Sequence, residues 1–523
     1  MLSRHEVLAA QPAREMLSDG HWIVPTFAGE PRVNKPPTMG WLIAGAMRLT
    51  QSREEWVARL PAMLAAAVTA VLAGAIVARP LGRGAGLVAG LTTATSYFVL
   101  MQGRLSEADM PMAACVTAAM WVFLRANDGA GAAISGAGDD PGSRAPGLAG
   151  HAMLFYLLVA LSFLLKGVGP GFVLPACLVF ALIRRDGRAL KFILHPAGLA
   201  LFAGMALSWP LAAWLTYPPI AEAWHRELFQ RVSGELSEQI GRDDPWYAYF
   251  GFVPLLLLPW FPLTLVGAAA GFRAGWHRTP VGTLLLCWFA VGFVILSSVA
   301  WRNKHYAIPI VPACSAATAA GFLLWVRHSL SRPAREGRVV QGLFLFACVA
   351  GAVGLIVAGK MEGRHAFASA AATLGLGGAA VIECFIRRRG ALGAGMAFAT
   401  AWALCALAYW KIVPLHDGYR PSAELGRRVT ATVPSGEVVH LVRLGENHVA
   451  YYIDRPMRRI DNPADVPARL TDARRPLYLL GPASVEPALS TALGPLERLE
   501  QIPVTSRRQK PEDRLTFWRT IAP

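Results

Sequence analysis

Residues 152–183 read AMLFYLLVALSFLLKGVGPGFVLPACLVFALI. Lys166 is the one charged residue in this stretch, and Gly167, Gly169 and Pro170 follow it. A helix needs about 20 mostly apolar residues to cross a hydrocarbon layer about 30 Å thick. Two apolar runs that meet at a short polar break therefore predict two membrane-spanning helices joined by a tight turn.

Similar apolar runs recur along the chain. Of the 523 residues, 54% are hydrophobic and 16% are charged, whereas soluble domains carry about 25% charged residues. A soluble protein this apolar would expose large sticky patches. We therefore predict a mainly α, polytopic transmembrane bundle of about 12 helices, placed at 57–78, 85–103, 109–125, 152–166, 169–183, 196–216, 247–270, 280–299, 306–326, 339–358, 366–386 and 391–412. Residues 37–49 are too short to cross and predict a helix along the interface.

The loops between these runs divide into two alternating sets. One set, which includes Arg184, Arg185 and Arg188, holds about twice as many basic residues as the other. Basic residues concentrate in cytoplasmic loops, so this set is predicted to be cytoplasmic. The other set, the N-terminal segment and the C-terminal tail are then predicted to be extracytoplasmic.

Three regions follow from these patterns. Residues 1–56 form a predicted first extracytoplasmic loop with interfacial helices, 57–414 the transmembrane bundle, and 415–523 a small extracytoplasmic α/β domain. In the last region, short apolar stretches alternate with stretches suited to helix, which is typical of α/β folds. The predicted strands are Val438–Leu444, Pro476–Leu480 and Leu515–Trp518, and the predicted helices are Ala464–Ala473 and Val485–Leu493. Residues 126–150, rich in Gly, Ala and Ser, predict a flexible cytoplasmic loop.

The net charge of +16 does not indicate a nucleic-acid partner. The basic residues lie mostly between apolar runs, where they set orientation and contact anionic lipid headgroups. All seven cysteines fall inside apolar runs, and none has the spacing of a metal site or disulfide framework. They are interpreted as small apolar residues.

Polar residues gather on the predicted outward side. Polar groups at the edge of a membrane bundle are costly and are functional candidates by default. Loops far apart in sequence supply carboxylates, amines and aromatic rings to one face. The segments are RVNKPP (32–37), GRLSEADMPM (103–112), KGVGP (166–170), 225–246 and RNKHYAIP (302–309).

Asp109 has two compatible interpretations. It opens a predicted span after Ser106 and Glu107, with Pro111 just inside. A carboxylate at that position is favoured by the helix dipole, so Asp109 is a candidate helix cap. It is equally a candidate general base, placed to take a proton from an acceptor hydroxyl or amine.

A second group of candidates is cationic. Lys35, Lys166, Arg302 and Lys304 would reduce the cost of the negative charge that grows on a phosphate leaving group. The alternative is that these long side chains only extend toward the membrane interface. His305 is either a metal ligand or a hydrogen-bonded interfacial group. The 217–246 loop, rich in both charge signs, is either a solvated helix with ion pairs or a lid over the acceptor site.

These segments together resemble a known superfamily. AREM (Ala13–Met16), GHWIVP (Gly20–Pro25), Lys35-Pro36-Pro37 and ARLP (Ala58–Pro61) are similar to the first outer loop of the aminoarabinose transferase and protein O-mannosyltransferase superfamily. The resemblance continues, in order over about residues 5–320, with Gly103-Arg104, Ala108-Asp109-Met110, Lys166-Gly167, Pro259-Trp260, and Lys304-His305-Tyr306 with Ile308-Pro309.

The resemblance implies the GT-C architecture and a polyprenyl-phosphate-linked sugar as donor. It implies transfer, with inversion at the anomeric carbon, to a lipid or protein acceptor at the outer face of the cytoplasmic membrane. Asp109 would be the acidic residue of the site, while Lys35, Lys166, Arg302, Lys304 and Tyr306 would surround the donor phosphate. A divalent cation is the candidate cofactor, membrane lipids are further partners, and no nucleic acid is expected.

Two positions depart from the superfamily's pattern. Its members begin with a transmembrane helix that ends in an acidic pair, and His5-Glu6 occupies the position of that pair here. Either Glu6 takes the role of the second catalytic carboxylate, or the first acidic residue is lost. The missing helix suggests either a start codon assigned too far downstream or a truncated gene. Asn34 stands where an acidic residue often precedes KPP, which weakens an inherited metal site.

Two other functions fit a polytopic membrane protein. A transporter or flippase for a lipid-linked molecule would show paired halves and polar sites near mid-membrane, whereas the polar residues here gather at one face. A non-catalytic scaffold would bind partners through its outward domain and would tolerate changes at Lys35 and Asp109.

Overall fold

The computed structural model describes residues 1–33, 35–132, 148–222, 224–225, 245–299, 302–330, 335–362, 366–416, 420–462, 465, 476–502 and 514–521. The chain divides into two compact units. One unit, here called the loop–sheet unit, comprises Met1–Pro61, Ala212–Ala223 and His416–Pro523. The other, here called the helical unit, comprises Ala62–Leu211 and Trp224–Leu415.

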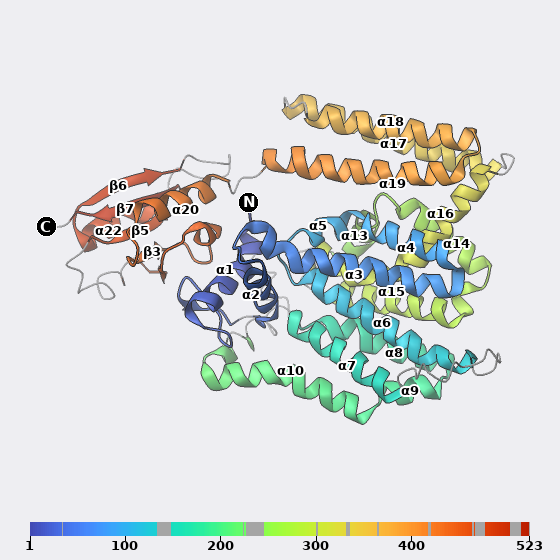
Figure 1. Cartoon of the computed structure of the whole chain (residues 1–523), viewed down its shortest axis with the longest axis horizontal. Coiled ribbons are helices and arrows are strands. Elements are labelled where there is room, and N and C mark those ends of the chain that lie inside the picture. Colours follow the sequence, from blue (N-terminus) through green and yellow to red (C-terminus); the bar gives the residue numbers. More distant parts are fainter. Residues whose placement is uncertain are drawn as a thin grey trace. The chain divides into compact units, whose positions relative to one another are not determined.

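The helical unit consists of apolar helices because a peptide group in hydrocarbon must find its hydrogen-bond partner within its own segment. Figure 1 shows α17, α18 and α19 side by side, and these helices contact one another in sequence order. The helices are α3 (Glu55–Leu81), α4 (Arg83–Ala94), α5 (Tyr97–Gly103), α6 (Asp109–Ala132), α7 (Leu148–Leu165), α8 (Gly169–Arg184), α9 (Gly187–Ile193), α10 (Pro196–Thr216), α13 (Ala248–Leu256), α14 (Phe261–Arg273), η1 (Trp276–Arg278), α15 (Pro280–Ser298), η2 (Lys304–Cys314), α16 (Ser315–Leu330), α17 (Arg335–Glu362), α18 (Ala366–Ile386), α19 (Gly390–Leu407), η3 (Ala408–Ile412) and η4 (Val413–His416). The first residues of α3 and the last of α10 belong to the loop–sheet unit.

Several of these helices are suited to a membrane. Among the described residues, seven are long and apolar enough to cross it, or up to nine if each of two bent pairs forms one span. The bent pairs are α4 with α5, at 61°, and α13 with α14, at 102°. Each of the twelve predicted ranges contains helix, while the predicted number of about 12 spans stays a prediction.

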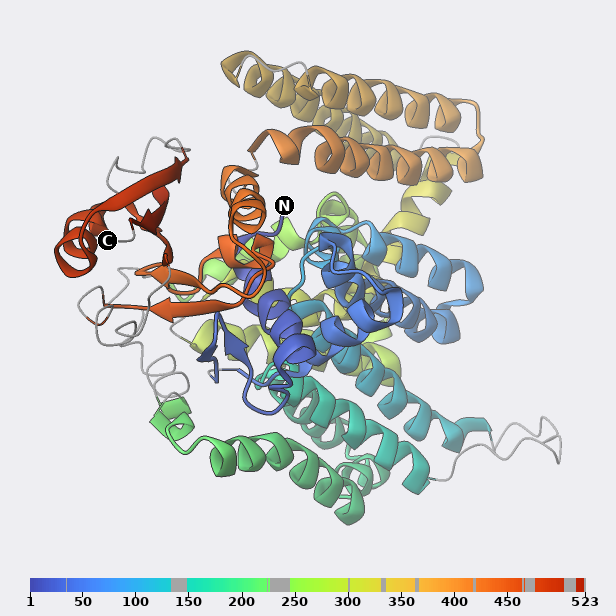
Figure 2. The same ribbon diagram turned by 60° about the vertical axis from the view of Figure 1, so that its left-hand side comes forward.

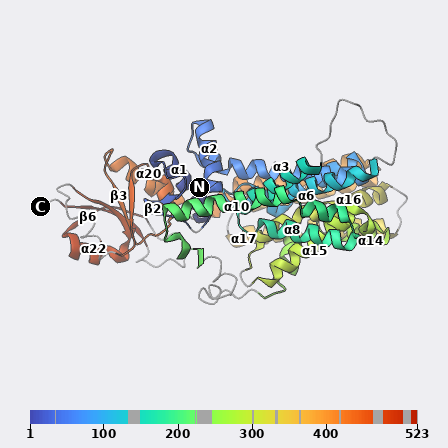
Figure 3. The ribbon, with the colours of Figure 1, turned by 90° about the horizontal axis from the view of Figure 1, so that it is seen from below.

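Small residues allow the helices to approach closely. A Cβ atom on Gly267 of α14 would lie 1.8 Å from the Ala317 carbonyl oxygen of α16, and one on Gly321 would lie 1.8 Å from the Leu263 carbonyl oxygen. Small residues at such crossings let two backbones make van der Waals contact, which is the main attraction between helices in lipid. The long helices of this unit run roughly along one direction (Figure 3).

The loop–sheet unit begins with α1 (Arg4–Asp19), the hairpin β1 (Thr26–Phe27) and β2 (Glu30–Pro31), and α2 (Thr38–Thr50). A capping box starts α1: the Ser3 hydroxyl accepts from the Glu6 amide, and the Glu6 carboxylate accepts from the Ser3 amide. At the hairpin turn Ala28 and Gly29 both have positive φ, 52° and 78°. Two successive residues with positive φ form the kind of two-residue turn whose twist matches that of the two strands in a hairpin.

A mixed sheet, coloured orange to red in Figure 2, lies in the C-terminal part of this unit. Its strand order is β4-β3-β5-β7-β6. Strand β3 (Val439–Val442) is parallel to β4 (Met457–Ile460) and to β5 (Tyr478–Pro482). Strand β7 (Leu515–Thr520) is antiparallel to β5 and to β6 (Leu496–Gln501). The helices of this part are α20 (Arg420–Thr432), η5 (His448–Tyr452), η7 (Ala483–Val485) and α22 (Glu486–Leu493). Leu489 of α22 joins a core with Leu479, Trp518 and Val442 of the sheet.

Residues far apart in sequence bind one another inside this unit. The Arg14 guanidinium of α1 donates to the Tyr451 carbonyl and pairs with Asp454 at 2.9 Å. The Tyr452 hydroxyl accepts from the Leu2 amide and donates to Glu55 at 3.0 Å. The predicted first loop and the predicted C-terminal domain are therefore parts of one compact unit.

The predicted fold class is confirmed: the chain is mainly helical, with membrane-spanning helices and a small sheet region at its C-terminal end. The three predicted strands correspond to β3, β5 and β7, and the second predicted helix to α22. Most of the other predicted helix, Ala464–Ala473, lies outside the described residues, as do most of 126–150 and 217–246. The edge strands β4 and β6 were not predicted, because MRRI and LERLEQ are rich in charge.

His440 makes the sheet sensitive to acid. It lies on the inner strand β3, opposite Arg458 of β4 and Leu479 of β5. Burial, with help from Arg458, lowers the pKa of His440 to about 4. Its unfolded pKa is near 6.5, so the unfolded chain binds the proton more strongly, and the stability that neutral His440 allows is lost as pH falls from about 6.5 toward 4.

We predict that the free energy of opening at β3 falls by about 2 kcal/mol between pH 7 and pH 4.5. Hydrogen exchange of peptides that contain Val439–Val442, corrected for intrinsic exchange rates, measures this change. His440→Gln should remove most of it, whereas the exposed-site control His21→Gln should leave it intact. An unchanged pH dependence in His440→Gln would contradict the assignment.

Candidate active site

Asp109 and Lys166 form an ion pair in the helical unit. Asp109 is the first residue of α6, so its carboxylate lies at the helix end that stabilises negative charge. Lys166 lies in the turn between α7 and α8, where its amide donates to the Ser162 carbonyl. The Asp109 Oδ1 atom is 2.6 Å from Lys166 Nζ, and the exposed fractions of the two side chains are 6% and 21%.

The pair is mutually stabilised. Burial acts to lower the pKa of the Lys166 ammonium, but the Asp109 carboxylate, with smaller contributions from Tyr306 and Glu107, outweighs burial and raises it. Lys166 is therefore a cation at neutral pH. A buried charge that loses its partner is strongly unfavourable, so the Asp109 carboxylate favours the charged form of Lys166.

An aromatic ring covers the cation. Lys166 Nζ lies 4.2 Å from the centroid of the Tyr306 ring, which belongs to η2. The negative face of an aromatic ring attracts a cation at this distance. The His305 ring packs edge-on against Tyr306 with centroids 4.7 Å apart. Asp109, Lys166 and Tyr306 thus bring α6, the α7–α8 turn and η2 together.

The glycines after Lys166 have different surroundings. A Cβ on Gly169 would lie 2.4 Å from the Ser162 hydroxyl oxygen, so Gly169 allows the turn to close on α7. A Cβ on Gly167 would meet only the Phe163 ring, at 3.8 Å. Close packing against α7 thus explains why a glycine is needed at position 169. Of these two glycines, only Gly167 leaves room for a ligand near its backbone.

Arg302 and Lys304, the two predicted cations close to Tyr306 in sequence, make their described contacts outside the Asp109–Lys166 pair. Arg302 Nη2 donates to the Ser297 carbonyl at 2.9 Å. Lys304 is exposed, and its Nζ lies 5.8 Å from the centroid of the Phe252 ring. Both are neighbours of Tyr306 in sequence. Their predicted roles at the donor phosphate stay predictions.

Glu6 and Lys35 belong to the loop–sheet unit. Glu6 is buried, and its two carboxylate oxygens accept from Arg59 at 2.7 and 3.2 Å in addition to its role in the capping box. Lys35 is exposed and contributes, after burial, to a lowered pKa of His5. The described contacts of Glu6 are structural, while the catalytic role predicted for it and the phosphate role predicted for Lys35 stay predictions.

A metal centre is not evident in the part of the chain that the structure describes. No group of three or more His, Cys, Asp or Glu side chains there is arranged to hold a metal ion. His305 contacts the Tyr306 ring, and Asn34 lies outside the described residues. The divalent cation suggested by the resemblance stays a prediction.

Sequence reasoning missed some of the polar contacts. Arg59 was noted within ARLP without a role. Its guanidinium donates one hydrogen bond to each carboxylate oxygen of Glu6. The Tyr249 hydroxyl, which donates to the Asn303 carbonyl at 3.0 Å and supports the segment before η2, was not singled out. For Arg59, the signal was an arginine at the start of an apolar predicted span, with a carboxylate in the predicted loop that precedes it.

The sequence of the chain is similar to those of several known proteins. Residues 34–133 match the family described as dolichyl-phosphate-mannose-protein mannosyltransferase. A protein of Aquifex aeolicus (strain VF5) is 25% identical over 490 residues, which are 89% of this chain and 86% of that protein. The undecaprenyl phosphate-alpha-4-amino-4-deoxy-L-arabinose arabinosyl transferase of Edwardsiella ictaluri (strain 93-146) is 26% identical over 310 residues. That match covers 58% of this chain and 52% of the enzyme, so the match spans about half the length of this relative.

A solved structure agrees over the full length of the chain. The crystal structure of ArnT from Cupriavidus metallidurans bound to undecaprenyl phosphate superimposes with a TM-score of 0.76 at 16% identity, over 100% of this chain and 94% of that one. The chain therefore has a GT-C-type fold like that of this structure, as predicted. The predicted resemblance to the aminoarabinose transferases is confirmed as a similarity in sequence and in fold.

We predict that Lys166→Met lowers the stability of the helical unit by about 3–5 kcal/mol, because it leaves the Asp109 carboxylate buried without its main partner. Thermal unfolding in detergent, followed by tryptophan fluorescence, measures the loss. The double variant Asp109→Leu/Lys166→Met should lose less than the sum of the single variants. Lys304→Met, an exposed lysine in the nearby segment, is the matched control and should be near neutral. Additive losses in the double variant would show that the pair is not coupled.

Proposed function

We propose that this chain transfers a sugar from a polyprenyl-phosphate donor to a lipid or protein acceptor at the outer face of the cytoplasmic membrane. The observation that carries the proposal is the buried Asp109 carboxylate 2.6 Å from the Lys166 ammonium, under the Tyr306 ring. The similarity to arabinosyl transferases, and the fold shared with a protein solved with undecaprenyl phosphate, support the same reaction class.

The reaction consists of one substitution at the anomeric carbon. An acceptor hydroxyl or amine attacks C1 of the sugar, the C1–O bond to phosphate breaks, and the electron pair of that bond leaves on the phosphate. The acceptor's proton passes to Asp109, which acts as general base. Attack from the face opposite the leaving phosphate inverts the configuration at C1.

Lys166 is suited to the leaving group. The phosphate gains negative charge as C1–O breaks, and a fixed ammonium nearby stabilises that charge more in the transition state than in the bound donor. When the phosphate draws on the Lys166 charge, the Asp109 carboxylate is held less tightly and becomes a better base. Tyr306 keeps the ammonium in place through its ring and offers a hydroxyl to the phosphate.

The protein is proposed to lie in the cytoplasmic (inner) membrane. The candidate site and the loop–sheet unit are then on the extracytoplasmic side of that membrane. The distribution of basic residues supports this orientation. Contacts within the loop–sheet unit add a constraint, since Arg14 pairs with Asp454, and Tyr452 bonds to Glu55. These contacts support a topology in which the segments before the first described span and after the last lie on the same side of the membrane.

We predict that Asp109→Asn lowers the transfer rate at least about 100-fold while donor binding persists, because the amide cannot accept the proton. Transfer from radiolabelled polyprenyl-phosphate sugars in membranes measures the rate. The matched control is Asp186→Asn at the start of α9, where the side chain accepts from the Arg188 and Ala189 amides and asparagine caps equally well. Normal turnover by Asp109→Asn would remove the proposed role.

The orientation is tested by single cysteines at exposed positions, with the parent chain as the labelling baseline. Glu54→Cys and Ser435→Cys should react with a membrane-impermeant maleimide in intact spheroplasts. Arg188→Cys, in the predicted cytoplasmic set, should react only after permeabilisation. The reverse pattern would overturn the orientation, and opposite results for Glu54→Cys and Ser435→Cys would contradict a shared side for the two segments.

A further inference from the structure

The turn between α8 and α9 and the short helix η1 carry a group of cations outside the candidate active site. Arg184 is the last residue of α8, Arg185 follows it, and Arg188 lies in the first turn of α9. The Arg184 guanidinium donates to the Arg278 carbonyl of η1 at 2.6 Å. This hydrogen bond joins the two segments, so their charges lie on one surface of the helical unit.

The charge of this surface is strongly unbalanced. Residues 184–195 and 273–280 contain one acidic residue and six lysine or arginine residues. The six cations, here called the basic cluster, are all exposed: Arg184, Arg185, Arg188, Lys191, Arg273 and Arg278. The acidic residue, Asp186, caps α9 by accepting from the Arg188 and Ala189 amides. No member of the basic cluster pairs with a carboxylate in the ranges that the structure describes.

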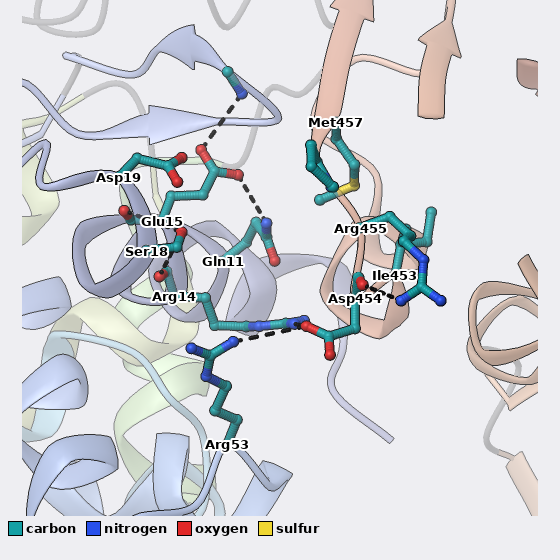
Figure 4. A pocket seen from close by; sticks show the side chains of 12 residues that line it. Gln11, Arg14, Glu15, Ser18, Asp19, Arg53, Ile453, Asp454, Arg455 and Met457 are labelled. Carbon is teal, nitrogen blue, oxygen red and sulfur yellow. Dashed lines mark hydrogen bonds and ion pairs between the residues drawn. The ribbon is translucent and has the colours of Figure 1, made fainter. Parts of the chain in front are cut away.

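Comparable cations elsewhere in the chain have carboxylate partners. In the cleft of Figure 4, Arg14 and Arg53 both pair with Asp454, at 2.9 and 3.7 Å. At the turn between α18 and α19, Arg387 pairs with Glu383 at 2.5 Å. Like charges repel one another, and the repulsion is stronger where lipid lowers the dielectric constant. An anion from outside the described chain would relieve this repulsion in the basic cluster.

The surface of α8 beside the basic cluster is apolar and exposed. Leu178 and Leu182 lie about one turn apart on α8, and their exposed fractions are 40% and 63%. Ile183, which directly precedes Arg184, is exposed as well. Lipid tails are as apolar as leucine, so acyl chains can cover these side chains. A ligand that fits both surfaces therefore combines an anionic head with hydrocarbon chains.

We propose that the basic cluster and the adjacent face of α8 form a binding site for an anionic phospholipid. The phosphodiester would accept from Arg185 and Arg188, because a planar guanidinium can donate two parallel hydrogen bonds to one phosphate. The acyl chains would lie along Leu178 and Leu182. Basic pockets at the ends of membrane helices bind lipid headgroups in this way. Free phosphate would satisfy the cations but would leave the apolar side chains uncovered.

This inference goes beyond the proposed sugar transfer. None of its residues belongs to the Asp109–Lys166 pair or contacts Tyr306 among the described interactions. A lipid with two phosphates should bind more tightly than one with a single phosphate. The reason is that the bond from Arg184 holds η1, with Arg278, against the α8–α9 turn.

The test is native mass spectrometry of the delipidated full chain in detergent micelles, titrated with phosphatidylglycerol, diphosphatidylglycerol and phosphatidylcholine. The parent chain should bind one equivalent of either anionic lipid saturably, diphosphatidylglycerol more tightly, and phosphatidylcholine much more weakly. Arg185→Gln/Arg188→Gln should weaken anionic lipid binding at least about tenfold, because each basic residue near a membrane surface contributes about 1 kcal/mol. Arg185→Lys/Arg188→Lys keeps both charges and should retain most of the affinity.

The matched control is Arg388→Gln/Arg389→Gln at the α18–α19 turn. It removes the same charge, and Arg388 shares with Arg185 a positive φ, 58° and 50°. Lipid affinity should be unchanged in this control. Thermal unfolding without lipid checks that both glutamine variants are folded, as expected since the Arg185 and Arg188 side chains make no described bond.

Three results would overturn the proposal. The first is anionic lipid that adds without saturation, which would leave the basic cluster with a role in orientation alone. The second is equal affinity of the parent and Arg185→Gln/Arg188→Gln, or equal weakening in the control. The third is complete displacement of the lipid by inorganic phosphate, which would indicate a site for a soluble anion. Sugar transfer is not the readout, so a failed transferase assignment would leave the result unaffected.

Discussion

Hydrocarbon offers a peptide group no hydrogen bond, and this constraint determines where everything else in the chain can lie. Backbone polarity must be satisfied within each segment, so the apolar runs form helices. Charged side chains are then confined to helix ends and connecting turns, unless they meet a partner. Asp109 and Lys166 do meet, at the start of α6 and in the α7–α8 turn, with 2.6 Å between carboxylate and ammonium. The same low-dielectric surroundings that make the bundle helical make this pair costly to separate.

Hydropathy was a sufficient guide to the helical part of the fold. Each predicted apolar range contains helix, because burial in lipid dominates over local propensity. It could not show that 85–103 and 247–270 are bent at 61° and 102°, since a bend depends on tertiary packing. In the sheet, the buried strands β3, β5 and β7 were readable from their apolar residues. The edge strands β4 and β6 were not, because charges that protect an exposed edge also hide its strand pattern.

The residues of the candidate site could be predicted from the sequence, but which of them contact one another could not. Order and composition singled out Asp109, Lys166 and Tyr306, which the structure brings together around α6, the α7–α8 turn and η2. Sequence alone could not reveal that Glu6 is engaged by Arg59 and by its own helix cap, since that depends on where α3 begins relative to α1.

The contact between Arg14 and Asp454 has a consequence for how the protein is made. The two residues are 440 positions apart, and the whole helical unit is synthesised between them. Contacts between such distant positions form slowly and late. Helix α1 is therefore synthesised long before Asp454, and Arg14 lacks this partner until the segment that contains Asp454 has been made. A chain interrupted before Asp454 therefore carries an α1 that cannot make this contact, and incompletely assembled segments of that kind are prone to aggregation.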